Sequence, residues 1–488
     1  MLIRKSKPDA ERPPPTEEQA LIVDALRGTE ANLMVNALAG TGKTTTLELL
    51  QEASKTKPIL YLAFNKRVKE EAERKFPKTT LVKTFNGFGH SAWQRSYGNL
   101  EVDGKKLNTI FKEYANGLKG DERKETWEVY WEVLQACQIA KHCGYVPEGK
   151  YPNAKRLSKR EDVARRLEKK PDALTLQLLD HILHLSIQAA YKRWVDFDDQ
   201  VYMPTLFGGT FPRFPLALID EDQDLNLVNH EMLARSRHGR LALVGDRWQS
   251  IYAFRGAVTS GVQRLKERFN CTEYDLSLCF RCPEAVVEEA RWRAPNLRAA
   301  KSGGSVKHLK QLEASSIPDT ATFICRNNAP LFRLALRLLA SRRPVSIAGS
   351  EIGPKVARLL EKVCHEDDNQ DQMLGHIADW RVRQLDEASE HGRAVIEDTA
   401  ECLQVFASFG RTRSEAIAYL KHLFEQRGSI YLTTAHKAKG GEWPIVYFLD
   451  PWLAKETDLD EQVLNLRYVV QTRAQEALYY IDSEAIRW

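Results

Sequence analysis

The stretch from Pro215 to Ala257 reads PLALIDEDQDLNLVNHEMLARSRHGRLALVGDRWQSIYAFRGA, and it decides the fold. Two short apolar runs, Leu216 to Ile219 and Leu241 to Val244, have the length and composition of buried strands. A segment with a helical pattern joins them, which is typical of neighbouring strands in a parallel sheet. Polar residues follow each run at once, so we predict an α/β fold with polar groups at the carboxyl ends of the strands. Ligands bind at that edge in such folds.

The acidic run after the first strand has two interpretations. Asp220 and Glu221 suit a divalent metal next to a base that positions water. A bare acidic pair is also typical of a solvated turn. The residues that follow the second strand, Gly245 to Ala257, decide between these interpretations below.

Composition sets the broad class of the protein. A chain of 488 residues is too long for one core and predicts three or four domains. The charged fraction of 28% is ordinary for a soluble protein, and the net charge of +5 permits a nucleic-acid partner without indicating one. We expect no membrane span, because no run approaches the roughly 18 apolar residues that a span needs.

The expected location is the cytoplasm. The N-terminus has no apolar core of the kind found in signal peptides. Eight cysteines without framework spacing indicate reduced thiols. Cys279 and Cys282 form a CxxC pair, but a zinc site usually needs four ligands, so we predict no metal there.

A phosphate-binding loop is the second decisive feature. The apolar run Asn32 to Asn36 leads into ALAGTGKT at residues 37–44. Gly40 and Gly42 let backbone amides point at phosphate oxygens, and the helix that follows adds its dipole. Lys43 is expected to reach the β and γ phosphates, and the Thr44 hydroxyl to bind magnesium. The loop predicts ATP with Mg²⁺, but by itself it does not separate a helicase from a GTPase or a kinase.

The string from Gly245 to Ala257, together with Asp220 to Asp224, closely resembles two adjacent motifs of the UvrD/Rep/PcrA family of superfamily 1 DNA helicases. The chain is identified as a member of that family because further motifs follow in family order over almost its whole length. The resemblance implies two RecA-like parallel-sheet lobes, each with a mainly helical inserted subdomain. These further motifs include residues 81–88, 195–199, 274–283, 430–443 and 464–474.

The expected domain boundaries follow from the positions of the motifs. The first lobe comprises residues 1–95 and 196–273, with a helical insertion at 96–195. The second lobe comprises residues 274–350 and 428–488, with a small helical insertion at 351–427. Family members often carry a much larger insertion at this last position.

The resemblance also implies an ATP site between the lobes. Lys43, Thr44 and Asp220 would hold Mg-ATP, and Glu221 would orient or deprotonate the attacking water. Gln249 would sense the γ phosphate, while Arg281 and Arg473 would supply positive charge from the second lobe. The cofactor-binding set is completed by Gln19 at the adenine edge, Phe280 stacked on the adenine, Glu442 at the ribose, and the loop residues Ala39, Gly40, Thr41 and Gly42.

Single-stranded DNA is the expected partner, and stacking on aromatic side chains would bind it without sequence preference. Phe64, Tyr252 and Phe254 are the stacking candidates, with core packing as the alternative for Tyr252. Core packing is also the alternative for Phe85 and Phe88, in a motif that departs from the family pattern at Asn86-Gly87. The other expected contacts are Thr84 with a phosphate, Arg255 as a link between the two sites, and Thr433 and His436 from the second lobe.

Two features leave alternatives open. The basic segment Lys150 to Lys170 would either face the DNA backbone or form a solvated helix face. The last motif departs from the family pattern at Val470-Gln471, although Thr472-Arg473-Ala474 is intact.

The function implied is that of an ATP-dependent 3′–5′ DNA helicase that acts on single strands and duplex junctions in repair, recombination or replication. The isolated chain is expected to be a monomer. One alternative is a strand-stimulated translocase that serves as the motor subunit of a repair or defence complex. A nucleotide-dependent DNA-binding module without turnover is the other alternative. The five intact residues Lys43, Glu221, Gln249, Arg281 and Arg473 argue against it.

Overall fold

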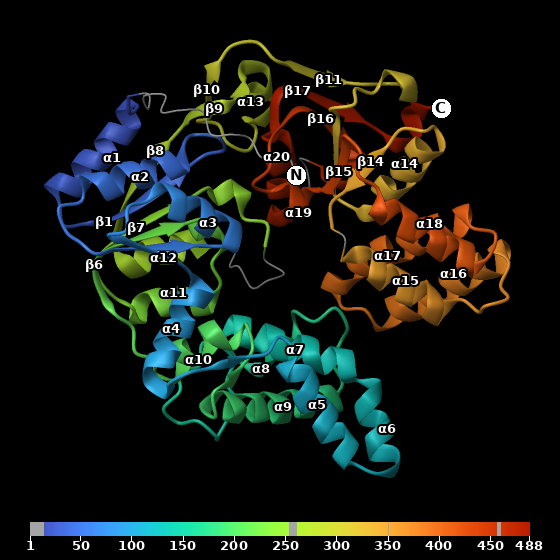
Figure 1. Cartoon of the computed structure of the whole chain (residues 1–488), viewed down its shortest axis with the longest axis horizontal. Helices are drawn as coiled ribbons and strands as arrows, with labels where there is room; N and C mark the ends of the chain where they lie inside the picture. Colours follow the sequence, from blue (N-terminus) through green and yellow to red (C-terminus); the bar gives the residue numbers. More distant parts are fainter. Residues whose placement is uncertain (1–13, 253–260, 350, 456–459) are drawn as a thin grey trace.

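The computed structural model describes residues 14–252, 261–349, 351–455 and 460–488. Within these ranges the chain forms two parallel sheets that lie side by side, with a group of helices attached to each (Figure 1). The fold class is therefore the expected α/β class with two RecA-like lobes.

The first sheet has the strand order β3-β2-β6-β7-β1-β8 in the described part of the chain, and every neighbouring pair is parallel. Both apolar runs of the opening stretch lie at its centre, and α11 joins them as predicted. The strands are β1 (Asn32–Ala37), β2 (Ile59–Ala63), β3 (Thr80–Thr84), β6 (Arg213–Asp220), β7 (Arg237–Gly245) and β8 (Cys271–Leu276). The helices are α1 (Glu17–Gly28), α2 (Lys43–Ala53), α3 (Lys66–Lys75), α4 (Phe85–Tyr97), α11 (Leu227–Arg235) and α12 (Gly261–Phe269).

Side chains of the central strands alternate between two hydrophobic cores, one on each face of the first sheet. In β1, Leu33 and Val35 enter the core beneath α1 and α2, whereas Met34 enters the core beneath α4 and α11. Strands buried on both faces need continuous apolar runs, which is the pattern read from the sequence. This packing fixes the strand ends, and with them the polar residues that follow.

The second sheet has the strand order β11-β17-β16-β13-β15-β14 in the described residues, and it is also parallel. Its strands are β11 (Ser305–His308), β13 (Thr322–Cys325), β14 (Val345–Ile347), β15 (Ile430–Thr434), β16 (Trp443–Leu449) and β17 (Ala474–Ile481). Its helices are α13 (Glu284–Ala290), α14 (Asn328–Ala340), α19 (Ala435–Ala438) and α20 (Glu461–Gln471). Two small parallel pairs flank it, β9 (Leu278–Pro283) with β10 (Arg298–Lys301) and β12 (Leu312–Glu313) with β18 (Ile486–Arg487).

The first helical insertion runs from residue 101 to residue 207. Its core contains the buried residues Phe111, Val133 and Ile182. Its elements are β4 (Glu101–Val102), α5 (Lys106–Gly117), α6 (Gly120–Glu128), α7 (Tyr130–Cys143), α8 (Arg160–Ala164), α9 (Ala173–Tyr191), β5 (Trp194–Val195) and α10 (Asp199–Phe207).

The second helical insertion packs on the core of the second lobe and consists of α15 (Ile352–Val363), α16 (Gln370–Glu387), α17 (Glu390–Phe409) and α18 (Arg413–Glu425). It also touches the first insertion, where the Ser389 amide donates to the Glu168 carbonyl at 2.8 Å. Lys169 forms an ion pair of 3.0 Å with Glu387 at the same contact. The two insertions lie side by side there (Figure 1).

Three expected boundaries need correction. Helix α4 begins at Phe85, directly after β3, and continues to Tyr97, so the first segment of the first lobe extends beyond residue 95. Tyr202 and Met203 of α10 pack into the core of the first insertion, which therefore extends beyond residue 195. Strand β8 pairs with β1 as far as Leu276, so the first lobe extends beyond residue 273.

The basic segment at residues 150–170 is not a solvated helix face. Only Arg160–Ala164 is helical there. Several of its cations form ion pairs within the protein: Lys155 pairs with Glu231 at 2.8 Å, and Arg160 pairs with Asp180 at 3.2 Å.

No described helix is both long and apolar enough to cross a membrane.

A buried charge cluster holds the first insertion together. Lys106 and Lys141 have fully buried side chains, and Asp199 lies between them at 2.5 and 2.7 Å. Lys141 also pairs with Asp196 at 2.5 Å. Burial opposes the charged form of Asp199, but Lys141 and Lys106 outweigh it and lower its pKa to about 2. The motif at residues 195–199 therefore stabilises the fold of the first insertion.

We predict that Asp199→Ala lowers the free energy of unfolding by about 3–5 kcal/mol, because it leaves two buried ammonium groups without this partner. Asp199 has a folded-state pKa below its unfolded value of 3.8, so its stabilising effect is present above that value and is lost as the pH falls toward about 2. Urea denaturation at pH 7 measures the change. Asp121→Ala, on the exposed surface of α6, is the matched control. Equal stability of the two variants would contradict the prediction.

Candidate active site

The carboxyl ends of β1, β6 and β7 meet at one edge of the first sheet. Residues 38–42 leave β1 there and return into α2. Gly40 and Gly42 have φ values of 72° and 86°, a region in which residues with a Cβ are strained. Gly42 occupies the N-cap of α2 without a side-chain cap, so the first amides of the helix remain directed at the loop. The expected phosphate loop therefore has an anion-binding conformation.

Lys43 is the first residue of α2, and its Nζ lies 3.4 Å from Oε2 of Glu221. Burial lowers the pKa of Lys43, but Glu221, Asp246 and Asp220 more than compensate and raise it. Burial raises the pKa of Glu221, yet Lys43 and Lys439 lower it to about 2. Both side chains are therefore charged at neutral pH.

Asp220 ends β6 and accepts a hydrogen bond of 2.7 Å from the Tyr61 hydroxyl. Burial and the neighbouring Glu221 raise its pKa to about 6, since the acidic run carries more negative charge than its partners neutralise. Asp222 Oδ2 and Asp224 Oδ1 are buried without a hydrogen-bond partner. A bound cation would stabilise these two unpartnered carboxylate oxygens.

The residues present fit Mg²⁺. The ion prefers hard oxygen ligands and usually takes one or two carboxylates together with substrate phosphates. Asp220 and the Thr44 hydroxyl supply oxygen ligands of this kind. Within the described ranges, no three His, Cys, Asp or Glu side chains are grouped to hold a metal by themselves. Binding of the ion would therefore depend on the nucleotide.

A chain of hydrogen bonds joins the ends of β6 and β7. Gln223 Nε2 donates to Glu221 at 2.5 Å, and Gln223 Oε1 accepts from the Asp246 amide at 3.0 Å. Gln249 Nε2 in turn donates to Asp246 at 2.6 Å. Neither Gln223 nor Asp246 was predicted as a site residue, although Asp246 follows β7 directly and Gln223 lies three residues beyond the end of β6. Together they fix the orientation of Glu221 and Gln249.

Arg473 reaches this chain from the second lobe. Its Nη2 lies 3.3 Å from Gln249 Oε1, and its Nε donates to the Val469 carbonyl at 2.9 Å. Burial and the nearby Arg281 lower the pKa of Arg473 to about 10. Arg281 pairs with Glu442 at 2.7 Å. Glu442, expected at the ribose, is thus the partner of Arg281 in this structure.

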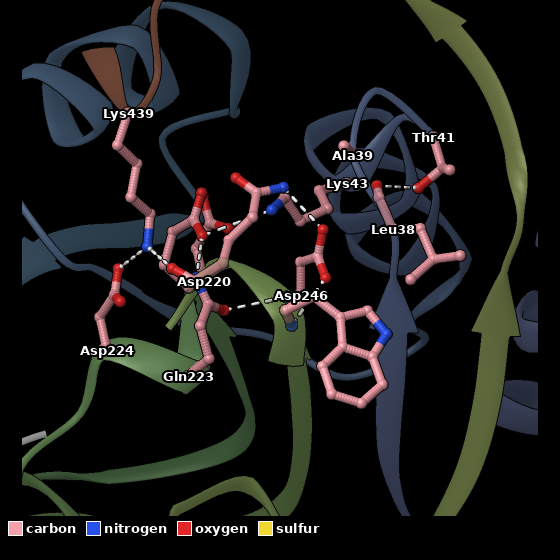
Figure 2. Close-up of polar contacts among 12 residues, drawn as sticks. Leu38, Ala39, Thr41, Lys43, Asp220, Gln223, Asp224, Asp246 and Lys439 are labelled. Atoms are coloured by element: carbon pink, nitrogen blue, oxygen red, sulfur yellow. Dashed lines mark hydrogen bonds and ion pairs between the residues drawn. The ribbon is translucent and has the colours of Figure 1, made fainter. Parts of the chain in front are cut away.

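Lys439 is a further cation that the sequence analysis missed. It follows α19 in the second lobe, and its Nζ lies 2.5 Å from Asp224 and 2.7 Å from the Gln249 carbonyl, both of the first lobe. Figure 2 shows Lys439 on one side of the acidic cluster and Lys43 on the other. The ammonium group also lies 5.1 Å from the Tyr252 ring centroid. The only sequence signal for Lys439 was its position inside the motif at residues 430–443.

Gln19 and Phe280 contact the phosphate loop from two sides. Gln19 is buried, and its Nε2 donates to the Thr46 hydroxyl at 3.1 Å. Its Oε1 accepts from the Thr16 amide, and this hydrogen bond is part of the N-terminal cap of α1. It is therefore not a surface glutamine. The Phe280 amide donates to the Gly40 carbonyl at 2.9 Å, while its ring is 45% exposed. An exposed ring beside the loop is available for stacking.

The candidate strand-binding aromatics come together in part. The rings of Phe64 and Tyr252 are stacked with centroids 5.8 Å apart, and the Tyr252 hydroxyl donates to the His436 carbonyl at 3.4 Å. Tyr252 thus bridges the lobes, and its half-buried ring also packs against the core of the second lobe, in agreement with the alternative interpretation. Phe254 and Arg255 lie outside the described residues.

Two residues of the strand-binding set are used locally. The Thr84 hydroxyl caps α4 by accepting from the Gly87 amide at 3.1 Å. Thr433 is 1% exposed inside β15, and its hydroxyl donates to the Thr434 carbonyl, so it is not placed to meet a strand. Phe85 and Phe88 are buried in the core, as their alternative interpretation had it.

Phe197 is an exposed aromatic residue that the sequence analysis did not select. Its ring is 60% exposed, and its carbonyl accepts a 2.6 Å hydrogen bond from Asn86 Nδ2. The buried pairs of Asp196 and Asp199 hold the backbone on both sides of it. The position of this aromatic residue between the acidic residues of the motif at 195–199 was the sequence pattern that could have singled it out.

A phosphate loop that faces acidic strand ends, with arginines from a second parallel sheet, defines a nucleotide-binding protein of the two-lobed RecA-like class. The chain belongs to the UvrD/Rep helicase family. A model of the UvrD/REP helicase N-terminal domain matches residues 16–270, and one of the UvrD-like helicase C-terminal domain matches residues 429–481.

Several curated proteins are similar to this chain. F-box DNA helicase protein 1 of Schizosaccharomyces pombe is 26% identical over 96% of this chain and 57% of its own length. F-box DNA helicase 1 of Gallus gallus is 23% identical over 91% of this chain and 46% of its own length. A probable DNA helicase II homolog of Mycoplasma pneumoniae is 29% identical over 39% of this chain and 24% of its own length. The chain thus spans about half of the two F-box relatives and a quarter of the third. Among solved structures, an arterivirus nonstructural protein 10 (helicase) aligns with a TM-score of 0.35 and 11% identity, over 94% of this chain and 61% of that one.

We predict that Gly40→Ala weakens nucleotide binding at least roughly tenfold, because a left-handed conformation costs an alanine about 1–2 kcal/mol. A Cβ at this position would also lie 2.7 Å from Arg281 Cβ and 2.8 Å from Cys279 Sγ. Titration with a fluorescent ATP analogue measures the effect. Gly28→Ala is the control, since a Cβ there meets nothing within 4 Å. Unchanged affinity in Gly40→Ala would show that the loop tolerates the added methyl group.

Proposed function

We propose that the protein is an ATP-driven motor that translocates 3′ to 5′ on single-stranded DNA and unwinds duplex DNA during repair, recombination or replication. Membership of the UvrD/Rep helicase family supports the activity. The direction and the pathway rest on family resemblance alone.

The contact between Arg473 and Gln249 is the observation that carries the proposal. It joins the second lobe to the hydrogen-bonded chain that ends at Glu221. Glu221, held as a carboxylate by Lys43, would orient the attacking water, and Lys43 would hold the phosphates. Mg²⁺ bound through Thr44 and Asp220 would neutralise phosphate charge. Transfer of a phosphoryl group needs positioning and charge neutralisation above all, and these groups can supply both.

Coupling to DNA would pass through Lys439 and Tyr252. Lys439 contacts Asp224 beside the nucleotide site and lies over the Tyr252 ring, which stacks on Phe64. A change in the separation of the lobes would therefore move the aromatic residues proposed to hold the strand. His436, whose carbonyl accepts from Tyr252, is the proposed strand contact of the second lobe.

A second candidate is a strand-stimulated translocase that serves as the motor subunit of a repair or defence complex. The small second insertion, with four helices in its described part, favours it. Unwinding assays distinguish the two candidates. Duplex unwinding from a 3′ tail alone supports the first, stimulation of ATP hydrolysis without unwinding supports the second, and unwinding from a 5′ tail contradicts the proposed direction.

We predict that Lys43→Ala lowers kcat for ATP hydrolysis by roughly 10²–10³-fold, the loss typical when one preorganised donor to developing charge is removed. The fold should remain intact, because this side chain belongs to the ligand site rather than to the core. Steady-state hydrolysis with and without single-stranded DNA is the measurement. Lys75→Ala, whose half-exposed side chain pairs with Glu48 away from the nucleotide site, serves as the control. Hydrolysis by Lys43→Ala at the wild-type rate would exclude this loop as the ATP site.

Phe64→Ala should leave basal hydrolysis near wild type but weaken stimulation by single-stranded DNA. Stacking on an aromatic side chain contributes about 1–3 kcal/mol per base, so the DNA concentration for half-maximal stimulation should rise roughly 5- to 150-fold. Trp488→Ala, which removes a 47% exposed aromatic residue far from this site, is the control. If both variants behave like wild type, the strand does not stack on Phe64.

A further inference from the structure

A pair of cysteines contacts the phosphate loop from the second lobe. Cys279 and Cys282 lie on β9, on either side of Phe280 and Arg281. A Cβ on Gly40 would lie 2.8 Å from Cys279 Sγ, so this sulfur packs directly against the loop. Cys282 Sγ donates to the Thr472 carbonyl at 3.6 Å, immediately before Arg473. The two thiols therefore lie between the loop and both arginines of the site.

The backbone brings the Cys282 amide to the Cys279 sulfur. In a regular strand, residues i and i+3 are separated by about 10 Å, whereas a disulfide needs Cα atoms within roughly 7 Å. Strand β9 is irregular here: Cys279 pairs with Ala299 and Pro283 with Lys301, so four steps of β9 match two steps of β10. Because of this bulge, the Cys282 amide lies 3.3 Å from Cys279 Sγ and donates a hydrogen bond to it.

The environment favours one thiolate in this pair. The pKa of Cys279 is lowered to about 6 by the neighbouring Cys282 side chain, by the amides of Cys282 and Arg281 and by the Arg281 charge. The other six cysteines have pKa values raised by burial. Since the thiolate is the reactive form, Cys279 is the thiol whose pKa most favours reaction, and both thiols of the pair are buried in this structure.

We propose that Cys279 and Cys282 are a reversible oxidation site, and that a disulfide between them switches off the ATP hydrolysis proposed above. Hydrogen peroxide is the oxidant class. The Cys279 thiolate attacks one peroxide oxygen, which yields a sulfenic acid and releases hydroxide, and this takes up a proton to give water. The Cys282 thiol then attacks the Cys279 sulfur, the S–O bond breaks, and a second water leaves. Two thiols lose two electrons, and one peroxide becomes two waters.

The disulfide would disturb the site through three contacts. Formation of an S–S bond of about 2.05 Å pulls Cys279 Sγ away from the amides that donate to it. Phe280 and Arg281 lie inside the closed ring, so the Phe280 bond to Gly40 and the Arg281 pair with Glu442 must shift. Cys282 also loses its bond to Thr472. A displacement of about 1 Å at catalytic groups can cost roughly a hundredfold in rate.

The test treats the purified full chain with hydrogen peroxide and then alkylates the remaining thiols. Peptide mass spectrometry should find a Cys279–Cys282 disulfide, ATP turnover should fall at least roughly tenfold, and dithiothreitol should restore it. Cys279→Ser, which lacks the reacting thiolate, should form no such disulfide and keep its turnover after peroxide. Cys271→Ser, which removes a buried thiol of the first lobe, should respond like wild type.

Three results would overturn the proposal: no disulfide in wild type, a disulfide that leaves turnover unchanged, or an equal loss of turnover in Cys279→Ser. If Cys279→Ser does not fold, Cys282→Ser replaces it: peroxide should then leave a Cys279 sulfenic acid or a higher oxide that peptide mass spectrometry detects, and no disulfide. If reduced wild type hydrolyses no ATP, the proposed function fails by itself. The disulfide is then tested by peptide mass and by its effect on affinity for a fluorescent ATP analogue.

Discussion

The salt bridge between Lys43 and Glu221 is the interaction on which the rest of the site depends. It links the phosphate loop after β1 to the acidic run after β6. The parallel sheet ends both strands at one edge, so the two groups meet although 178 positions separate them in the sequence. Without the lysine, a carboxylate would be buried beside Asp220, Asp222 and Asp224, whose pKa values are already raised by burial. The pair thus keeps the base charged in an acidic environment.

The seam between the lobes extends this electrostatic arrangement. The Tyr468 hydroxyl of α20 accepts from the Ala39 amide at 3.2 Å and lies 3.4 Å from Asp246. The Asn465 side chain donates to the Ser250 carbonyl at 2.8 Å. Leu38 and Ala39 pack within a hydrophobic core of the second lobe. Both lobes therefore contribute to one packed and hydrogen-bonded interface. Because α20 contacts the phosphate loop directly, a displacement of the loop would also displace α20.

Sequence patterns predicted the parts of the fold that depend on local regularity. Apolar runs identified the central strands, and glycine spacing identified the phosphate loop. The predicted domain boundaries were wrong where tertiary packing sets the ends of elements. Strand β8 extends to Leu276 because it pairs with β1. Helix α10 belongs to the first insertion because Tyr202 packs into the core of that insertion. The charge run at 150–170 forms only the short helix Arg160–Ala164, and Lys155 and Arg160 pair with acids of other segments that the local pattern does not indicate.

The sequence predicted which positions belong to motifs, but it did not predict which residues their side chains contact. Thr433 and Glu442 belong to one motif, yet Thr433 is buried in an interior strand with both of its neighbours, and Arg281 pairs with Glu442. Lys439 lies between them in the sequence and reaches across the seam to Asp224, a contact that no spacing rule contains. The same applies to Cys279 and Cys282, which a regular strand would hold too far apart and which the bulge in β9 brings together. What a side chain does here is set by the two sheets facing each other, and the sequence of either lobe alone does not contain that information.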